Sequence, residues 1–223
     1  MHKKMKTAII CSSLLLSFSV FVTQAYAQTD AAAKSKLNKV TQTYQGYKTL
    51  RANFTLTVQQ PQQASNYTES GTLSMEVATG KYRITTDRQD IISDGKTQWM
   101  VLKEEQEVQV TEVDNSSETI SPSTIFSFYT KGYKYVSAPD ERSGGTPLTV
   151  VELSPEDTQT PYFKIKLRIN QSSNLIHDVT IFDKSGVKYT YVLKNTTANP
   201  SIAADAFTFK QTNYPGMEIV DLR

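Results

Sequence analysis

The chain has 223 residues, and its 24 basic and 22 acidic side chains give a formal net charge of only +2. Lys3, Lys4 and Lys6 precede the first acidic residue, so the rest of the chain carries 21 basic and 22 acidic residues. This balanced and dispersed charge argues against a nucleic-acid-binding protein and against a polybasic membrane patch.

Residues 1–27 have the features of a cleaved export signal. Lysines open the segment, residues 7–22 are almost entirely apolar or small, and Ala25-Tyr26-Ala27 places small residues where a signal peptidase cuts. The apolar run is too short for a good membrane span. The single cysteine, Cys11, falls inside this segment. We therefore expect residues 28–223 to form one domain with no disulfide, thiol nucleophile, cysteine metal site or lipid anchor.

The first element after the signal has helical spacing. Residues 31–50 carry apolar side chains three or four positions apart, and Gly46 lies near the expected C-terminal end. The apolar positions of this predicted amphipathic helix are Leu37, Val40, Tyr44, Tyr47 and Leu50.

Most of the remaining chain alternates between apolar and polar residues, as strands do when one face is buried. Turn residues such as Asp94-Gly95 and Ser185-Gly186 separate these runs. About ten or eleven such strands predict antiparallel hairpins in one large sheet or barrel. The side chains that we expect on its apolar face are Phe54, Leu56, Leu73, Met75, Tyr82, Ile84, Trp99, Val101, Phe163, Ile165, Leu167, Ile181, Tyr189 and Tyr191.

The middle of the chain interrupts the alternation. Ser121-Pro122-Ser123-Thr124 is a helix-capping sequence, and the residues up to Gly132 predict a short central helix. Two helices over one curved sheet would form a lid above an apolar trough. An ordinary packed core is the alternative, and composition alone favours it. The predicted lid residues are Leu37, Val40, Tyr44, Ile125, Phe126, Phe128 and Tyr129.

The search for catalytic chemistry yields weak candidates. Ser93, Asp94 and Lys96 lie within four positions, but Asp94-Gly95 between two apolar runs is a strong hairpin signal. A lysine at a hairpin tip is normally solvated and does not activate a serine. His177 has no second histidine or cysteine near it in sequence, so it is a poor metal ligand. The sequence has no glycine-rich phosphate loop and no nucleophile elbow. These observations favour a protein that is not an enzyme and that needs no cofactor.

The order of these features resembles the periplasmic outer-membrane lipoprotein carriers of the LolA family, from about Leu37 to Val220. IISDGKTQWMV, with an aromatic residue at Trp99, is the most characteristic match. The other matching segments are LNKVTQTYQGYKTLRANFTLTVQQ, GTLSMEV, GKYRI, ISPSTIF, LIHDVTIFDKSGVKYTYVLKN, DAFTFK and YPGMEIVD.

The resemblance implies an unclosed antiparallel β-barrel, lidded by the two helices, whose apolar cavity shields the acyl chains of lipoproteins in the periplasm of a Gram-negative bacterium. An inner-membrane ABC transporter would load the carrier, and an outer-membrane acceptor or the membrane itself would receive the cargo. A monomer is the default expectation. One departure is that Ala78 and Thr79 replace the Arg-Pro pair whose arginine is thought to latch the lid; Arg83 is close by. A carrier or sensor of another lipid on the same fold therefore stays open, and so, more remotely, does a secreted esterase or glycosidase.

Overall fold

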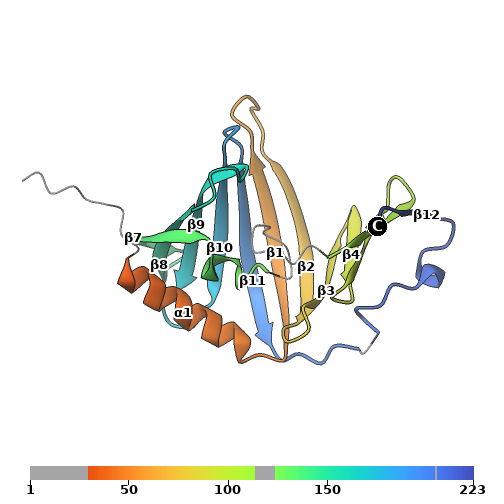
Figure 1. Cartoon of the computed structure of the whole chain (residues 1–223), viewed down its shortest axis with the longest axis horizontal. Helices are drawn as coiled ribbons and strands as arrows, with labels where there is room; N and C mark the ends of the chain where they lie inside the picture. Colours follow the sequence, from red (N-terminus) through yellow and green to blue (C-terminus); the bar gives the residue numbers. More distant parts are fainter. Residues whose placement is uncertain (1–29, 114–123, 204) are drawn as a thin grey trace, which may run out of the picture.

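A computed structural model describes residues 30–113, 124–203 and 205–223 (Figure 1). In this part of the chain one α-helix precedes twelve strands of a single sheet, with two short 3-10 helices between them. The described elements are α1 (Ala31–Gln45), β1 (Thr49–Gln59), β2 (Tyr67–Glu76), β3 (Lys81–Thr86), β4 (Gln89–Ser93), β5 (Thr97–Leu102), β6 (Glu107–Glu112), η1 (Phe128–Thr130), β7 (Tyr133–Ser143), β8 (Thr146–Pro155), β9 (Tyr162–Asn170), β10 (Ile176–Asp183), β11 (Lys188–Ala198), η2 (Gln211–Asn213) and β12 (Glu218–Asp221).

The expected N-terminal helix is confirmed as α1, and its first turn is fixed to the sheet. The carboxylate of Asp30 accepts hydrogen bonds from backbone N–H groups of the first helical turn and, through its other oxygen, from the backbone N–H of Ser137 in β7. The hydrogen bonds from Ser137 and from the helix hold the pKa of Asp30 below its ordinary value. The helix ends at Gln45 and Gly46 caps it, while Leu50, which the sequence pattern assigned to the helix, lies in β1.

The sheet is unclosed, as expected, and curves beside α1 (Figure 1). Its strand order is β12-β6-β5-β4-β3-β2-β1-β11-β10-β9-β8-β7. It has more strands than the ten or eleven predicted. Neighbouring strands are antiparallel except at one edge, where β12 runs parallel to β6. Hairpin signals do not predict β12, because it follows a long segment without alternation.

The sheet buries apolar residues on both faces. The larger cluster joins α1 and residues 125–129 to one side of the sheet, which we call the inner face. A smaller cluster lies on the outer face of β4, β5 and β6, where Tyr214 and the segment around it cover Ile92, Val101 and Val108. Adjacent residues of a strand point to opposite faces, and directly paired residues of neighbouring strands share a face. The strand registers therefore assign each side chain to a face.

The predicted central helix is shorter than expected. Its described part is a turn over residues 124–127 followed by η1, while the predicted capping residues 121–123 lie outside the described residues. Phe126, Phe128 and Tyr129 are all buried. These three positions do not share one side of an α-helix, so packing on the sheet selects a tighter and less regular turn.

The expected export signal, residues 1–27, lies outside the described residues. Across the part of the chain that the structure describes, no helix combines the length and the apolar character needed to cross a membrane.

Candidate functional site

Most of the predicted cavity residues share the inner face. They form rows across the sheet, and one row runs from Leu167 through Val179 and Tyr191 to Leu56. This arrangement explains the alternation of the sequence, since every second residue of each strand contributes to the same surface. The predicted residues on the inner face are Phe54, Leu56, Leu73, Met75, Tyr82, Ile84, Ile165, Leu167, Ile181, Tyr189 and Tyr191.

The predicted lid residues all pack on this face. From α1, Leu37, Val40 and Tyr44 are at most 3% exposed. Phe126, Phe128 and Tyr129 are buried in the same cluster, and the partly buried Ile125 packs against it. We call residues 124–130 and α1 together the cover.

Aromatic rings and hydrogen bonds hold residues 124–130 against β7 and α1. The ring of Phe128 meets those of Tyr129 and Tyr133 edge-on, at centroid distances of 5.3 and 5.7 Å. The Tyr135 hydroxyl donates to the Tyr129 carbonyl at 2.7 Å, and Thr41 Oγ1 of α1 donates to the Tyr129 hydroxyl at 3.3 Å. Burial raises the pKa of the Tyr129 phenol, so this group stays neutral. The cover is thus a packed aromatic layer, held by a small number of polar contacts.

The cover does not bury the whole inner face. The apolar side chains that β8 and β9 contribute to the larger cluster are buried, whereas a set in β1, β3, β4, β10 and β11 is only partly buried. Ile84 pairs with Ile91 on one side of β2, and the other members pair with one another across β1, β11 and β10 on its other side; we call the whole set the apolar strip. They are Phe54, Leu56, Ile84, Ile91, Ile181, Tyr189, Tyr191 and Leu193.

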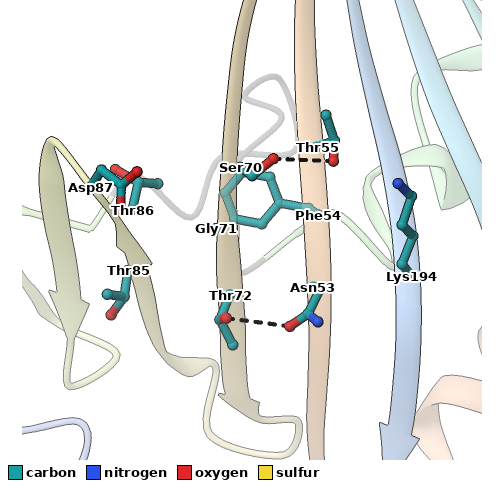
Figure 2. A pocket seen from close by; sticks show the side chains of 10 residues that line it. All are labelled: Asn53, Phe54, Thr55, Ser70, Gly71, Thr72, Thr85, Thr86, Asp87 and Lys194. Atoms are coloured by element: carbon teal, nitrogen blue, oxygen red, sulfur yellow. Dashed lines mark hydrogen bonds between the residues drawn. The ribbon is translucent and has the colours of Figure 1, made fainter.

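Gly71 shapes the centre of the apolar strip. A Cβ atom at this position would lie 2.6 Å from the Thr85 carbonyl oxygen and 2.7 Å from Cζ of Phe54, so the ring occupies the space that a side chain would need. Figure 2 shows the Phe54 ring against β2 at Gly71, between the hydrogen bonds that join Thr55 to Ser70 and Thr72 to Asn53.

The same ring borders a hollow of about 430 Å³ between β1, β2 and β3 (Figure 2). Most of its lining is polar, with hydroxyl groups of β2 and β3, Asp87 at one end and Lys194 at the other. A polar lining does not suit an acyl chain, because the chain would desolvate hydroxyl and charged groups without replacing their hydrogen bonds. The apolar strip is therefore the better candidate for such a ligand.

Two predicted cavity residues, Trp99 and Val101, lie on the other side of the sheet. Val101 is fully buried in the outer cluster, and Trp99 stacks on Phe209 with ring centroids 5.8 Å apart. Their neighbour Met100 pairs with the inner-face residue Ile91. The prediction was wrong because β5 is apolar on both faces, and the C-terminal segment covers the outer one.

The simple alternation also assigned Phe163 to the wrong face of the sheet. A register shift between β9 and β10 leaves it without a directly paired residue, and its neighbour Tyr162 takes the buried position. Phe163 is 52% exposed and its ring contacts Phe182, 6.2 Å away. A bulge of this kind changes the face of a side chain without any clear sign in the sequence.

Arg83 fixes the C-terminal segment on the outer face. Its guanidinium donates to the Tyr214 hydroxyl at 2.8 Å and to Asp90 at 3.2 Å, and the Tyr214 hydroxyl donates to Asp90 at 2.7 Å. Lys103 pairs with the other Asp90 oxygen at 2.9 Å. This network lies on the outer face, whereas residues 124–130 pack on the inner face, so Arg83 does not replace the latch arginine that the resemblance implies; Ala78 is exposed.

The weak catalytic candidates have structural roles. Ser93 Oγ accepts the backbone N–H of Gly95, and the Asp94 carboxylate accepts those of Lys96 and Thr97, which builds the predicted hairpin turn. His177 contacts Asp178, whose carboxylate also binds the Arg168 guanidinium. Within the described residues, no three histidine or acidic side chains gather as metal ligands.

Among the inner-face residues that were not predicted from the sequence, Glu69 is the charged one next to the apolar strip. Glu69 pairs with Leu56, and Leu56 pairs with Tyr191, so the carboxylate ends an apolar row. A signal was present: Glu69 occupies the same alternating phase of β2 as Gly71, Leu73 and Met75.

Comparisons with known proteins agree with this architecture. The family described as outer membrane lipoprotein carrier protein LolA matches residues 45–210. Among curated proteins, no sequence matches the chain.

Three solved structures are among those that resemble this chain. An uncharacterized conserved protein from Thermus thermophilus is 8% identical, with a TM-score of 0.58 over 85% of this chain and 99% of that one. A LolA superfamily protein from Nitrosomonas europaea is 13% identical, with a TM-score of 0.44 over 79% and 97%. LprF from Mycobacterium bovis is 12% identical, with a TM-score of 0.49 over 79% and 98%.

The Thermus protein shares the fold, and at 8% identity nothing more follows from that likeness. The family match carries more weight, because it extends from the end of α1 through β11 and into the C-terminal segment that covers the outer face. The chain belongs to the family of the outer membrane lipoprotein carrier protein LolA.

Proposed function

We propose that this protein is a periplasmic carrier that holds the acyl chains of lipoproteins on its inner face and delivers them to the outer membrane. The observation that supports this most directly is the pairing of two surfaces on one face of the sheet. The cover buries Phe126, Phe128 and Tyr129 there, and beside it the apolar strip is only partly buried. Membership of the LolA family points the same way.

The energetics of such a carrier require an opposing cost. Each buried CH₂ group contributes about 0.8 kcal/mol, so enclosing an acyl chain of about 16 carbons would stabilise the complex by roughly 13 kcal/mol. Cargo held so tightly would leave slowly. If the cover must first leave the inner face, the free energy of opening lowers the apparent affinity by the same amount. The aromatic packing of the cover would therefore set the affinity to a value that allows release.

The partners follow from the direction of transfer. The sequence has no glycine-rich phosphate-binding loop, so nucleotide hydrolysis by another protein would drive loading. An inner-membrane ABC transporter fills this role, and an outer-membrane acceptor or the membrane itself receives the cargo. Residues 1–27 would direct export, and residues 28–223 would act as one monomeric domain.

A release assay with spheroplasts tests the proposal. Spheroplasts carrying a labelled triacylated lipoprotein are incubated with the purified protein, and the supernatant is analysed by native mass spectrometry. The expected result is a soluble one-to-one complex. If no lipoprotein is released and another lipid co-purifies with the protein, the cargo assignment is wrong.

Two neighbouring substitutions on β3 sharpen the assay. Ile84 belongs to the apolar strip, whereas Thr85 is exposed and points to the outer face. Ile84→Glu should abolish release, because it puts a charge where the acyl chain would lie, and Thr85→Glu should leave release unchanged. Melting curves of both variants verify folding. Equal release by the two folded variants would contradict binding on the inner face.

A further inference from the structure

An acidic side chain lies at the end of one apolar row of the inner face. The row that contains Leu167, Val179, Tyr191 and Leu56 ends at Glu69 in β2. β3 ends before this row, so Glu69 faces the turns that follow β3 and β5 instead of another strand. The carboxylate thus lies at the end of the surface on which an acyl chain would be held.

One oxygen of this carboxylate lacks a partner. Oε1 of Glu69 is buried and makes no hydrogen bond in the structure, while Oε2 accepts a hydrogen bond from the Tyr67 hydroxyl at 3.2 Å. Glu69 forms no ion pair with any of the described residues. Buried polar atoms are nearly always hydrogen-bonded in folded proteins, so such an oxygen indicates a donor that comes from elsewhere.

Glu69 also lines a small pocket with a net negative charge. The pocket has a volume of about 190 Å³ and is bordered by Tyr67, Arg88, Glu104 and Glu105, together with Gln89 and Leu102. The lining includes three acidic residues and one arginine, and the arginine guanidinium lies over the Tyr67 ring at 5.5 Å from its centroid. The carboxylates are not gathered as metal ligands, since the described residues contain no such group.

We propose that this pocket binds a primary ammonium group of the cargo, with Glu69 Oε1 as the principal acceptor. The inference rests on the proposed carrier function. An ammonium group has three donors on a compact head, which suits a small acidic pocket beside an apolar surface. Two sources present this group next to acyl chains: a lysine near the acylated residue of a lipoprotein, or the amino headgroup of a phospholipid. Glu69 thus selects cargo, and the apolar strip holds it.

Matched lipopeptides test the proposal. Two diacylated peptides differ only at one residue near the acylated cysteine, which is lysine in one and acetyl-lysine in the other. The wild-type protein should bind the lysine peptide about tenfold more tightly, as expected for a charge-assisted hydrogen bond. Glu69→Gln keeps the shape of the side chain and should abolish this preference. Glu218→Gln removes the same charge from an exposed position of β12 and should preserve it.

Vesicles distinguish the second source. We compare the transfer of phosphatidylethanolamine and of N-acetylated phosphatidylethanolamine from vesicles to the wild type, to Glu69→Gln and to Glu218→Gln. A preference for the free amine in either pair, lost in Glu69→Gln, supports the proposal and identifies the source. Equal binding within both pairs by the wild-type protein overturns the ammonium site and leaves the carrier function intact. If the wild-type protein binds none of the acylated probes, both the ammonium site and the carrier function are contradicted.

The empty protein gives an independent readout. Glu69→Gln replaces a partly buried carboxylate, whose Oε1 is buried without a partner, by a neutral amide, so the variant without ligand should melt at a higher temperature than the wild type. A lower melting temperature would mean that the carboxylate stabilises the fold itself, and it would contradict a site that is kept for a ligand.

Discussion

The rings of Tyr44 and Phe126 stack with their centroids 4.1 Å apart and their planes 26° apart, which joins α1 to residues 124–130. The Tyr44 hydroxyl also accepts a hydrogen bond from the backbone N–H of Ile176 at 3.0 Å. One side chain of α1 therefore contacts both the aromatic part of the cover and the first residue of β10. Any movement of the cover must break or carry along this contact.

Phe126→Ala tests the cover. Loss of a buried aromatic ring should lower the free energy of unfolding by about 3 kcal/mol, measured in urea. If the cover competes with cargo, the variant should also bind an acylated probe more tightly, by roughly tenfold for each 1.4 kcal/mol removed from the cost of opening. Phe163→Ala, which truncates a half-exposed ring in the bulge of β9, should change neither value. Unchanged stability and unchanged affinity in Phe126→Ala would contradict competition.

Tyr44→Phe separates the hydroxyl from the ring. The stacked ring remains, but the Ile176 amide loses its acceptor at a buried position. The expected cost is about 1–3 kcal/mol in the free energy of unfolding. Tyr47→Phe is the matched control, since the Tyr47 hydroxyl has no hydrogen-bond partner among the described residues and its ring is only partly buried. If both variants unfold alike, the hydroxyl of Tyr44 is dispensable.

Gly71→Ala tests the space under the Phe54 ring. The new methyl group would lie within 3 Å of the Thr85 carbonyl and of the ring, so the ring or the strand must move. We expect a loss of about 1–3 kcal/mol in the free energy of unfolding. Gly46→Ala, at φ −71° with its nearest neighbours at 3.4 and 3.5 Å, should be tolerated. Equal tolerance of the two substitutions would show that the Phe54 ring yields easily.

Protonation of Asp90 at acidic pH should release the C-terminal segment from the outer face. Burial acts to raise the pKa of this carboxyl, but the Tyr214 hydroxyl and the Lys103 ammonium outweigh burial, and the pKa lies below its ordinary value of 3.8. A carboxyl with a lowered pKa in the folded state stabilises the protein fully above its unfolded pKa. That stabilisation is lost as the pH falls through the folded pKa.

The measurement is the free energy of unfolding from pH 6 down to below pH 3. The wild-type protein should lose stability below about pH 4. Asp90→Asn should be less stable at pH 6 and should show a flatter decline. Asp157→Asn, in the exposed turn after β8, should leave the slope unchanged. Parallel curves for the wild type and Asp90→Asn would exclude this carboxyl as the source.

Sequence alternation predicted the strands and most of the inner face, because each strand has one apolar phase. Alternation cannot say what covers the other face. Trp99 and Val101 belong to the continuous apolar run WMVL, which is typical of a strand buried on both sides. The covering residues Phe209 and Tyr214 lie more than a hundred positions later in the chain, in a segment with no regular pattern of its own. Their pairing with β5 depends on tertiary packing alone.

The sequence predicted one part of the cover, α1, more accurately than the other part, residues 124–130. α1 has a cap, a periodic apolar side and a terminal glycine, so local signals define it completely. Residues 124–130 follow a helix-capping sequence, but their conformation is set by three buried aromatic side chains that the sheet accommodates together. The charge of Glu69 was visible in the strand pattern. Its missing hydrogen-bond partner was not, because that depends on turns that are distant in sequence.

The strand order also governs how the chain must fold. β1 is the first strand made, yet it lies in the middle of the sheet between β2 and β11. The Thr49 hydroxyl donates to the carbonyl of Pro200, 151 positions later in the chain. Pairing over such a separation makes folding slow, because a long loop must close before the contacts form. Until β11 arrives, one edge of β1 and the apolar side chains beside it stay open to water and to other chains. The last long strand to be made completes the centre of the sheet.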